Sequence, residues 1–123
     1  MITETKTRKL ENGITVVEIS GRLNLGNSLL GIESGIKRLI DGGARKMILD
    51  LSAVNYIDSS GIGMLVACAG QLEQSSGRMR IVGASGAVAK AFEIVHMERI
   101  APLDETIANA EAGFALGADS AAR

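Results

Sequence analysis

The chain has 123 residues, of which 46% are hydrophobic and 22% charged, a size and balance typical of one compact domain. Its formal net charge of -1 argues against a direct nucleic acid partner or an anionic membrane surface, which both require a basic patch. No segment approaches the ~20 apolar residues needed for membrane insertion. The single cysteine, Cys68, gives no reason to expect an oxidising compartment. We therefore expect a cytoplasmic domain.

The first half of the chain predicts a hairpin, a helix and a buried strand. Asn12-Gly13 tolerates positive φ and separates two runs that predict antiparallel strands, residues 3–10 and 14–19. Apolar residues at helical spacing then predict a helix that ends at Asp41-Gly42-Gly43; they are Leu29, Ile32, Ile36, Leu39 and Ile40. The nearly continuous apolar run 46–51 is typical of a strand in the middle of a sheet.

The second half predicts three more helices and two short strands. After a connection over residues 52–57, a second helix is expected to begin at Asp58 with an apolar stripe of Ile62, Leu65, Val66, Ala69 and Leu72. A strand at 79–82, a helix carrying Val88, Ala91, Phe92 and Val95, a strand at 100–103 and a helix capped by Asp104 follow. This alternation predicts an α/β domain with a mixed, mostly parallel sheet, an N-terminal β-hairpin and about four helices.

Asp58-Ser59-Ser60-Gly61 lies at the edge where the parallel strands end, which is where sites form in such sheets. One interpretation is a helix N-cap, because Asp and Ser accept hydrogen bonds from free N–H groups. The other is a modification site, because Gly61 and Gly63 leave the hydroxyls uncovered. A phosphate there would add a charge of about -1.5 to -2 beside the positive end of the helix. The fold should tolerate that charge, whereas a docked partner should not.

The remaining polar residues do not indicate an enzyme, a cofactor or a metal site. A serine hydrolase needs a Gly-x-Ser-x-Gly elbow and a positioned histidine, but Ser59 and Ser60 lack the elbow and His96 is the only histidine. The sequence Gly83-Ala84-Ser85-Gly86 is neither a Walker motif nor a dinucleotide fingerprint, so it favours a plain turn between strand and helix. Cys68 is expected to serve in packing.

Two stretches, Leu49 to Ser52 and Tyr56 to Leu65, closely resemble the signature of STAS domains, the bacterial anti-sigma factor antagonists. The resemblance covers roughly residues 2–110. It implies a single STAS-like domain over residues 1–112, and we expect a flexible C-terminal tail over residues 113–123.

The resemblance implies partner switching. In such systems the antagonist binds a GHKL-type kinase that is also the anti-sigma factor, which releases the sigma factor; the kinase then phosphorylates a serine of the antagonist, and a phosphatase reverses this. The matching serine is Ser59, with Ser60 as second choice. The expected partner-binding residues are Asp58, Ser59, Ser60, Gly61 and Asn24. Asn24 stands where family members often have an acidic residue, so a contact made there would lack that charge.

The same resemblance implies an alternative. STAS modules also serve as scaffolds in stress-signalling assemblies or as accessory subunits of lipid or anion transport complexes. Such relatives often lack the acceptor serine, so the presence of Ser59 favours the antagonist.

Overall fold

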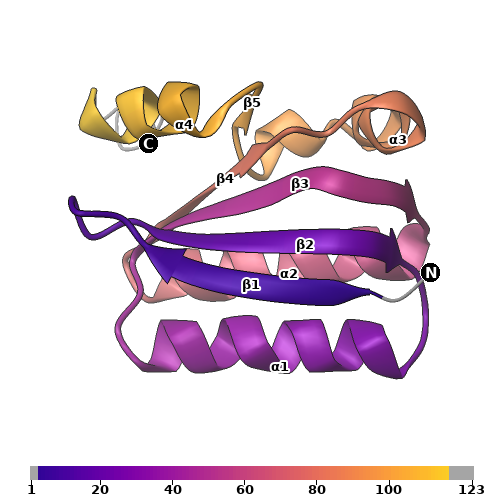
Figure 1. Cartoon of the computed structure of the whole chain (residues 1–123), viewed down its shortest axis with the longest axis horizontal. Coiled ribbons are helices and arrows are strands. Elements are labelled where there is room, and N and C mark those ends of the chain that lie inside the picture. The colour runs from indigo at the N-terminus through magenta and orange to yellow at the C-terminus, as the bar shows by residue number, and fades with distance from the viewer. Residues whose placement is uncertain (1–2, 117–123) are drawn as a thin grey trace.

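The computed structural model describes residues 3–116, and its centre is a five-stranded sheet in the order β1-β2-β3-β4-β5 (Figure 1). The first two strands form the predicted antiparallel hairpin, and the others are added in parallel. Gly13 turns the hairpin with a φ of +84°, a conformation that favours glycine. The strands are β1 (Glu4–Lys9), β2 (Thr15–Leu23), β3 (Lys46–Ile57), β4 (Arg78–Val82) and β5 (Leu103–Asp104).

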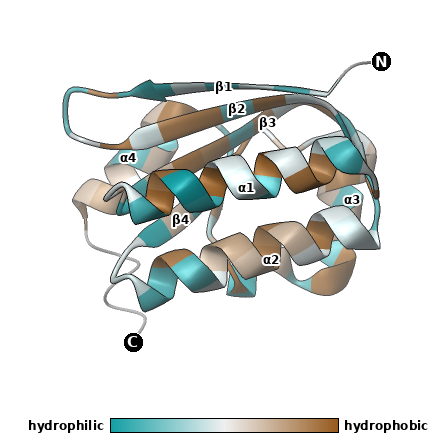
Figure 2. Cartoon of the chain, turned by 90° about the horizontal axis from the view of Figure 1, so that it is seen from below, coloured by the Kyte–Doolittle hydropathy of each residue, from teal (hydrophilic) through white to brown (hydrophobic). Residues whose placement is uncertain are grey.

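Four α-helices cover the sheet within the described residues, which confirms the predicted fold class. They are α1 (Asn27–Asp41), α2 (Ser59–Gln74), α3 (Gly86–Val95) and α4 (Ile107–Ala115), with a short 3-10 turn η1 (Met97–Arg99) after α3. The helices α1 and α2 lie side by side on one face of the sheet (Figures 1 and 2). The helix α4 packs against the opposite face.

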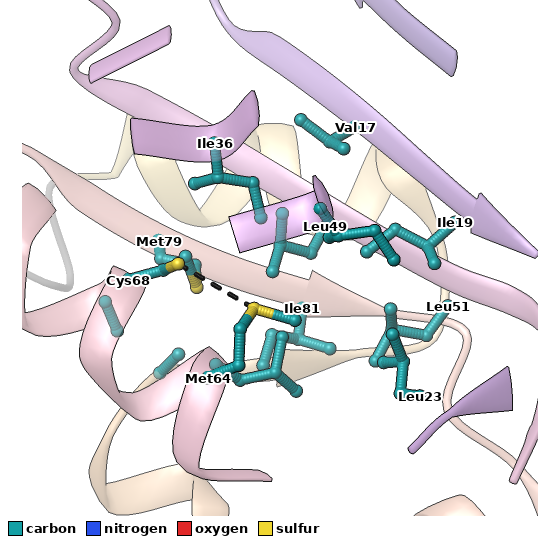
Figure 3. Packing of buried hydrophobic residues seen from close by; sticks show 14 of the residues in the cluster. Val17, Ile19, Leu23, Ile36, Leu49, Leu51, Met64, Cys68, Met79 and Ile81 are labelled. Atoms are coloured by element: carbon teal, nitrogen blue, oxygen red, sulfur yellow. Dashed lines mark hydrogen bonds between the residues drawn. The ribbon is translucent and has the colours of Figure 1, made fainter. Parts of the chain in front are cut away.

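The alternation of side chains along β2 supplies both core layers. Val17 and Ile19 point toward α1 and α2, where Ile36 and Met64 join the larger buried cluster (Figure 3). Val16, one residue along, points to the other face and packs in the smaller cluster beneath α4. Because successive strand residues face opposite sides, the nearly continuous apolar sequence of β3 is buried on both faces, as predicted for a strand in mid-sheet.

The strand β3 is longer than the sequence predicts, since residues 52–57 form strand rather than a connection. Its buried residues in this half are Leu51, Val54 and Ile57, a spacing of three. The register explains the spacing: Glu18 and Ser20 of β2 pair with Asp50 and Ala53, and a second shift follows at Gly21. Extra residues in β3 therefore form bulges, and these hide the period of two by which a strand is recognised.

Three predictions near the C-terminal end of the described chain do not match the structure. The cap of α4 is Thr106, whose hydroxyl accepts the N–H of Asn109, whereas Asp104 pairs with Arg80 of β4. The last strand begins at Leu103 rather than at residue 100, because η1 ends at Arg99 and residues 100–102 connect it to β5. The helix α4 also continues through residues 113–115, which were expected in the flexible tail. Residues 117–123 of that expected tail lie outside the described residues.

Candidate functional site

Asp58 joins two segments that are far apart in the sequence. Its side chain is the N-cap of α2, with Oδ1 accepting the N–H of Gly61 at 3.0 Å. The other oxygen, Oδ2, accepts the N–H of Leu25 at 3.1 Å. One carboxylate therefore holds the loop between β2 and α1 against the first turn of α2. The capping interpretation of Asp58 is correct, and the cap also has a tertiary role.

Gly61 lets the start of α2 approach the end of β2. A Cβ at this position would overlap the carbonyl oxygen of Leu23 and lie 2.8 Å from Cγ1 of Ile57. The N–H of Asp58 donates to the same Leu23 carbonyl at 3.1 Å. Gly61 is buried, so its role within the protein is to permit this close approach. Its contact with a partner, expected from the sequence, stays a prediction.

The two serines of the motif differ in exposure. Ser59 is exposed at the first residue of α2, whereas Ser60 is half-buried. Within residues 3–116 the Ser59 hydroxyl has no hydrogen-bond partner. The free N–H groups of a helix start give this position a positive electrostatic potential. The site can therefore receive a phosphate without displacing an internal contact.

The solvent-facing side of α2 continues from Ser59 as a smooth uncharged surface. It consists of Ser59, Gly63, Val66, Ala67 and Gly70, which are all exposed. A Cβ at Gly63 or Gly70 would meet no atom within 4 Å. The helix thus presents a face that a flat partner surface can approach closely. We call these five residues the α2 face.

The predicted apolar stripe of α2 is partly wrong at Val66, which is 37% exposed. Met64 and Cys68 are buried in its place, and the Cys68 thiol donates to the Met64 sulfur at 3.8 Å (Figure 3). Burial raises the pKa of Cys68 to about 11. Cys68 is therefore a protonated packing residue at neutral pH, as expected from the sequence.

The loop held by Asp58 brings a further residue to the site. Asn24 is half-buried, whereas Leu25 beside it is 76% exposed. Leu25 was not predicted from the sequence as part of the site. The available signal was an apolar residue between Asn24 and Gly26 in a segment with no helical or strand period. The structure thus brings together Asn24, Leu25, Asp58 and Ser59.

Asp58 should make stability depend on pH. The N–H groups of Gly61 first, and then of Leu25, hold its pKa below the usual value. Since the folded pKa is lower than the unfolded one, the stabilisation is complete above the unfolded pKa of about 4 and is lost as pH falls through the folded pKa. We expect Asp58→Asn to be less stable than wild type at pH 7, and the difference to shrink on acidification. Urea unfolding at several pH values measures this.

The exposed Glu93 of α3 provides a matched control, because Glu93→Gln removes one carboxylate away from the site. That variant should follow the wild-type pH profile. A difference between wild type and Asp58→Asn that stays constant down to pH 2 would contradict the role of the Asp58 charge.

None of the helices within residues 3–116 is long and apolar enough to cross a membrane. In the same part of the chain, no three His, Cys, Asp or Glu side chains are grouped so that they could hold a metal ion.

Comparison with known sequences agrees with the resemblance seen in the motif. The STAS domain family matches residues 6–110. BtrV of Bordetella bronchiseptica is 28% identical over 103 residues, 84% of this chain and 88% of that protein. The anti-sigma-B factor antagonist of Staphylococcus aureus is 26% identical over 89 residues, 72% of this chain and 82% of that protein.

Solved structures share the fold. An anti-sigma factor antagonist from Mycobacterium paratuberculosis superposes with a TM-score of 0.79 at 22% identity, covering 91% of this chain and 93% of that one. Unphosphorylated SpoIIAA, also an anti-sigma factor antagonist, gives 0.76 at 18% identity over 93% and 97% of the two chains. The murine anion transporter Slc26a9 gives 0.70 at 17% identity, covering 89% of this chain but 21% of the transporter.

Proposed function

Because the chain belongs to the STAS domain family, we propose that it is a cytoplasmic anti-sigma factor antagonist whose binding is switched off by phosphorylation of Ser59. In its unmodified form it binds an anti-sigma factor and so releases a sigma factor. The observation that carries the proposal is the exposed Ser59 hydroxyl at the first turn of α2, beside an Asp58 cap that holds a second loop in place.

The relatives with known roles support this choice. A protein of Staphylococcus aureus that matches 72% of this chain is named an anti-sigma-B factor antagonist. SpoIIAA, which shares the fold, has been solved in a phosphorylated form as well as an unphosphorylated one. We propose that the anti-sigma factor is a serine kinase of GHKL type and that a separate phosphatase restores the antagonist. The chain itself is proposed to act by binding, without enzymatic activity.

The geometry favours a switch that acts on docking rather than on the fold. A phosphate on Ser59 would add a charge of about -1.5 to -2 next to the N–H groups of the α2 start, where a negative charge is favourable. The α2 face beside it carries no charge. A partner packed on that face would have to desolvate the phosphate, and a loss of about 1.4 kcal/mol already weakens binding tenfold.

Phosphorylation of Ser59 can be tested with the kinase retained from a lysate of the source cell on immobilised antagonist. Incubation with that kinase and ATP should add one phosphoryl group to wild type and to Ser60→Ala, and none to Ser59→Ala. Intact-mass spectrometry measures the addition. Modification that persists in Ser59→Ala but disappears in Ser60→Ala would move the site to Ser60, the second choice.

Loss of docking is tested with Ser59→Asp, which places a permanent charge at the site. This variant should melt at the wild-type temperature and bind the anti-sigma factor at least tenfold more weakly by calorimetry. Wild-type affinity would refute the switch. A large fall in melting temperature would show that Ser59 is structural.

The second candidate function is that of an accessory or scaffold subunit in a transport or stress-signalling complex. The fold shared with Slc26a9 supports it. The two candidates differ in what the immobilised antagonist retains. An ATPase bound by wild type and not by Ser59→Asp supports the antagonist, whereas transporter subunits bound equally by both proteins support the accessory role.

A further inference from the structure

A groove runs between β1 and α1, away from the site described above. It consists of two hollows of about 350 Å³ and 290 Å³ that share Thr7, Arg38 and Leu39. Its lining includes three residues of the buried core, Val17, Ile32 and Ile36. In Figure 1, β1 lies directly above α1. We call it the β1–α1 groove.

The groove is open because α1 presents glycine where it faces β1. A Cβ at Gly31 would meet no atom within 4 Å, and one at Gly35 would meet only an Arg38 nitrogen at 4.0 Å. Every residue of β1 is exposed. Thr5 and Thr7 pair with Ile19 and Val17, so they point to the α1 side of the sheet. The underside of β1 is therefore accessible to another molecule.

The outer edge of β1 has no strand beside it among residues 3–116, because β1 is the first strand of the sheet order. An unpaired edge presents N–H and C=O groups that can bind an added strand. The groove extends along α1 from Gly31 to Gly42, about 16 Å at the helical rise of 1.5 Å per residue. An extended segment of about five residues has the same length, which matches the groove.

The positive charge of the groove favours an acidic segment. Its lining contains Arg8, Lys9 and Arg38 and no acidic residue. Arg8 already pairs with Glu18, with Nε and Oε2 at 3.2 Å, but within the described chain Lys9 and Arg38 have no ion pair. The C-terminal end of α1 lies nearby, and the partial negative charge of its free carbonyl groups would repel a carboxylate. Arg45 offsets this charge by donating to the carbonyl of Ile40 at 3.1 Å.

A buried hydroxyl gives a further indication. Thr15 lines the same end of the groove and is 4% exposed. Among residues 3–116 its hydroxyl has no hydrogen-bond partner, which is unusual for a buried polar group. An acceptor from a bound segment would supply one.

From these observations we propose that the outer edge of β1 binds an extended acidic segment of a partner protein, which adds a strand to the sheet and sets carboxylates against Lys9 and Arg38. The basic end of the groove lies beside the start of β3, whereas Ser59 follows the end of β3. The two surfaces therefore lie at opposite ends of that strand, and one antagonist can engage two partners.

The experiment uses a fluorescein-labelled peptide of alternating Glu and Val, seven residues long, and a matched peptide of alternating Lys and Val. Fluorescence anisotropy should show saturable binding of the acidic peptide and no binding of the basic one. Added salt should weaken the binding. The variant Lys9→Glu/Arg38→Glu should bind it at least tenfold more weakly. The control Lys90→Glu/Arg99→Glu makes the same charge change on α3 and η1 and should bind as wild type does.

A second variant tests the groove without changing charge. Gly31→Met fills the open space on α1 and replaces a glycine by a better helix former, so the fold should be retained while peptide binding is lost. Amide chemical shifts in wild type should change at β1 and at the glycines of α1. Equal binding of both peptides, or unchanged affinity in both variants, would overturn the proposal and leave the β1 charges as protection against edge-to-edge pairing.

Discussion

Replacing Asp104 by alanine is expected to lower the free energy of unfolding by about 3–5 kcal/mol, because it removes one partner of a largely buried ion pair. Nε and Nη2 of Arg80 lie 2.8 Å and 3.4 Å from the two carboxylate oxygens of Asp104. The Arg80 side chain is 9% exposed and that of Asp104 is 15% exposed. Urea denaturation at neutral pH measures the loss.

The position of Arg80 explains why the effect should be large. Its guanidinium packs so closely on α4 that a Cβ at Gly113 would overlap it, and it lies 5.7 Å from the centre of the Phe114 ring. In Asp104→Ala this charge stays beneath α4 and loses its hydrogen bonds to the Asp104 carboxylate. The pair therefore contributes, together with the apolar cluster around Phe114, to the packing of α4 on the sheet.

A double variant separates the burial of charge from the loss of packing. Arg80→Met/Asp104→Leu replaces both partners by apolar groups and should be much more stable than Asp104→Ala. A loss below about 1 kcal/mol in Asp104→Ala would instead mean that the pair behaves like a surface salt bridge.

Gly61→Ala should lower the free energy of unfolding by about 3 kcal/mol, since the added methyl group has no space. The obstruction is the carbonyl oxygen of Leu23, a backbone atom that cannot rotate away, together with the Ile57 side chain. Relief requires the start of α2 to move from β2. That movement would also disturb the hydrogen bonds by which Asp58 holds Leu25. Thermal and urea unfolding report the change.

Gly63→Ala is the matched control, two residues further along the same helix. Its Cβ would meet no atom within 4 Å, and alanine is a better helix former by about 1 kcal/mol. We expect this variant to be as stable as wild type or more stable. Equal losses at both positions would show that the contact with Leu23 is not what makes alanine unfavourable at Gly61.

Local sequence patterns were enough to predict the elements that depend on near neighbours. Asn12-Gly13 specifies the hairpin because its turn needs a positive φ, which Gly13 adopts. The helical spacing of Ile32 and Ile36 specifies α1. The start of α2 was also predictable, since the N-cap Asp58 accepts the N–H of Gly61, which is only three residues away in the sequence.

The tertiary structure alone decided the features that depend on residues far apart in the chain. The bulges that extend β3 arise from its register with β2, and the buried side of α2 is set by the elements packed on it, which left Val66 in solvent. Asp104 was predicted to cap a helix, but β4 places Arg80 beside it. The groove beside β1 and the contact of Leu25 with Asp58 likewise exist only after distant segments have met. The spacing of residues within one segment does not predict such contacts, because they depend on which other segments pack against it in the folded protein.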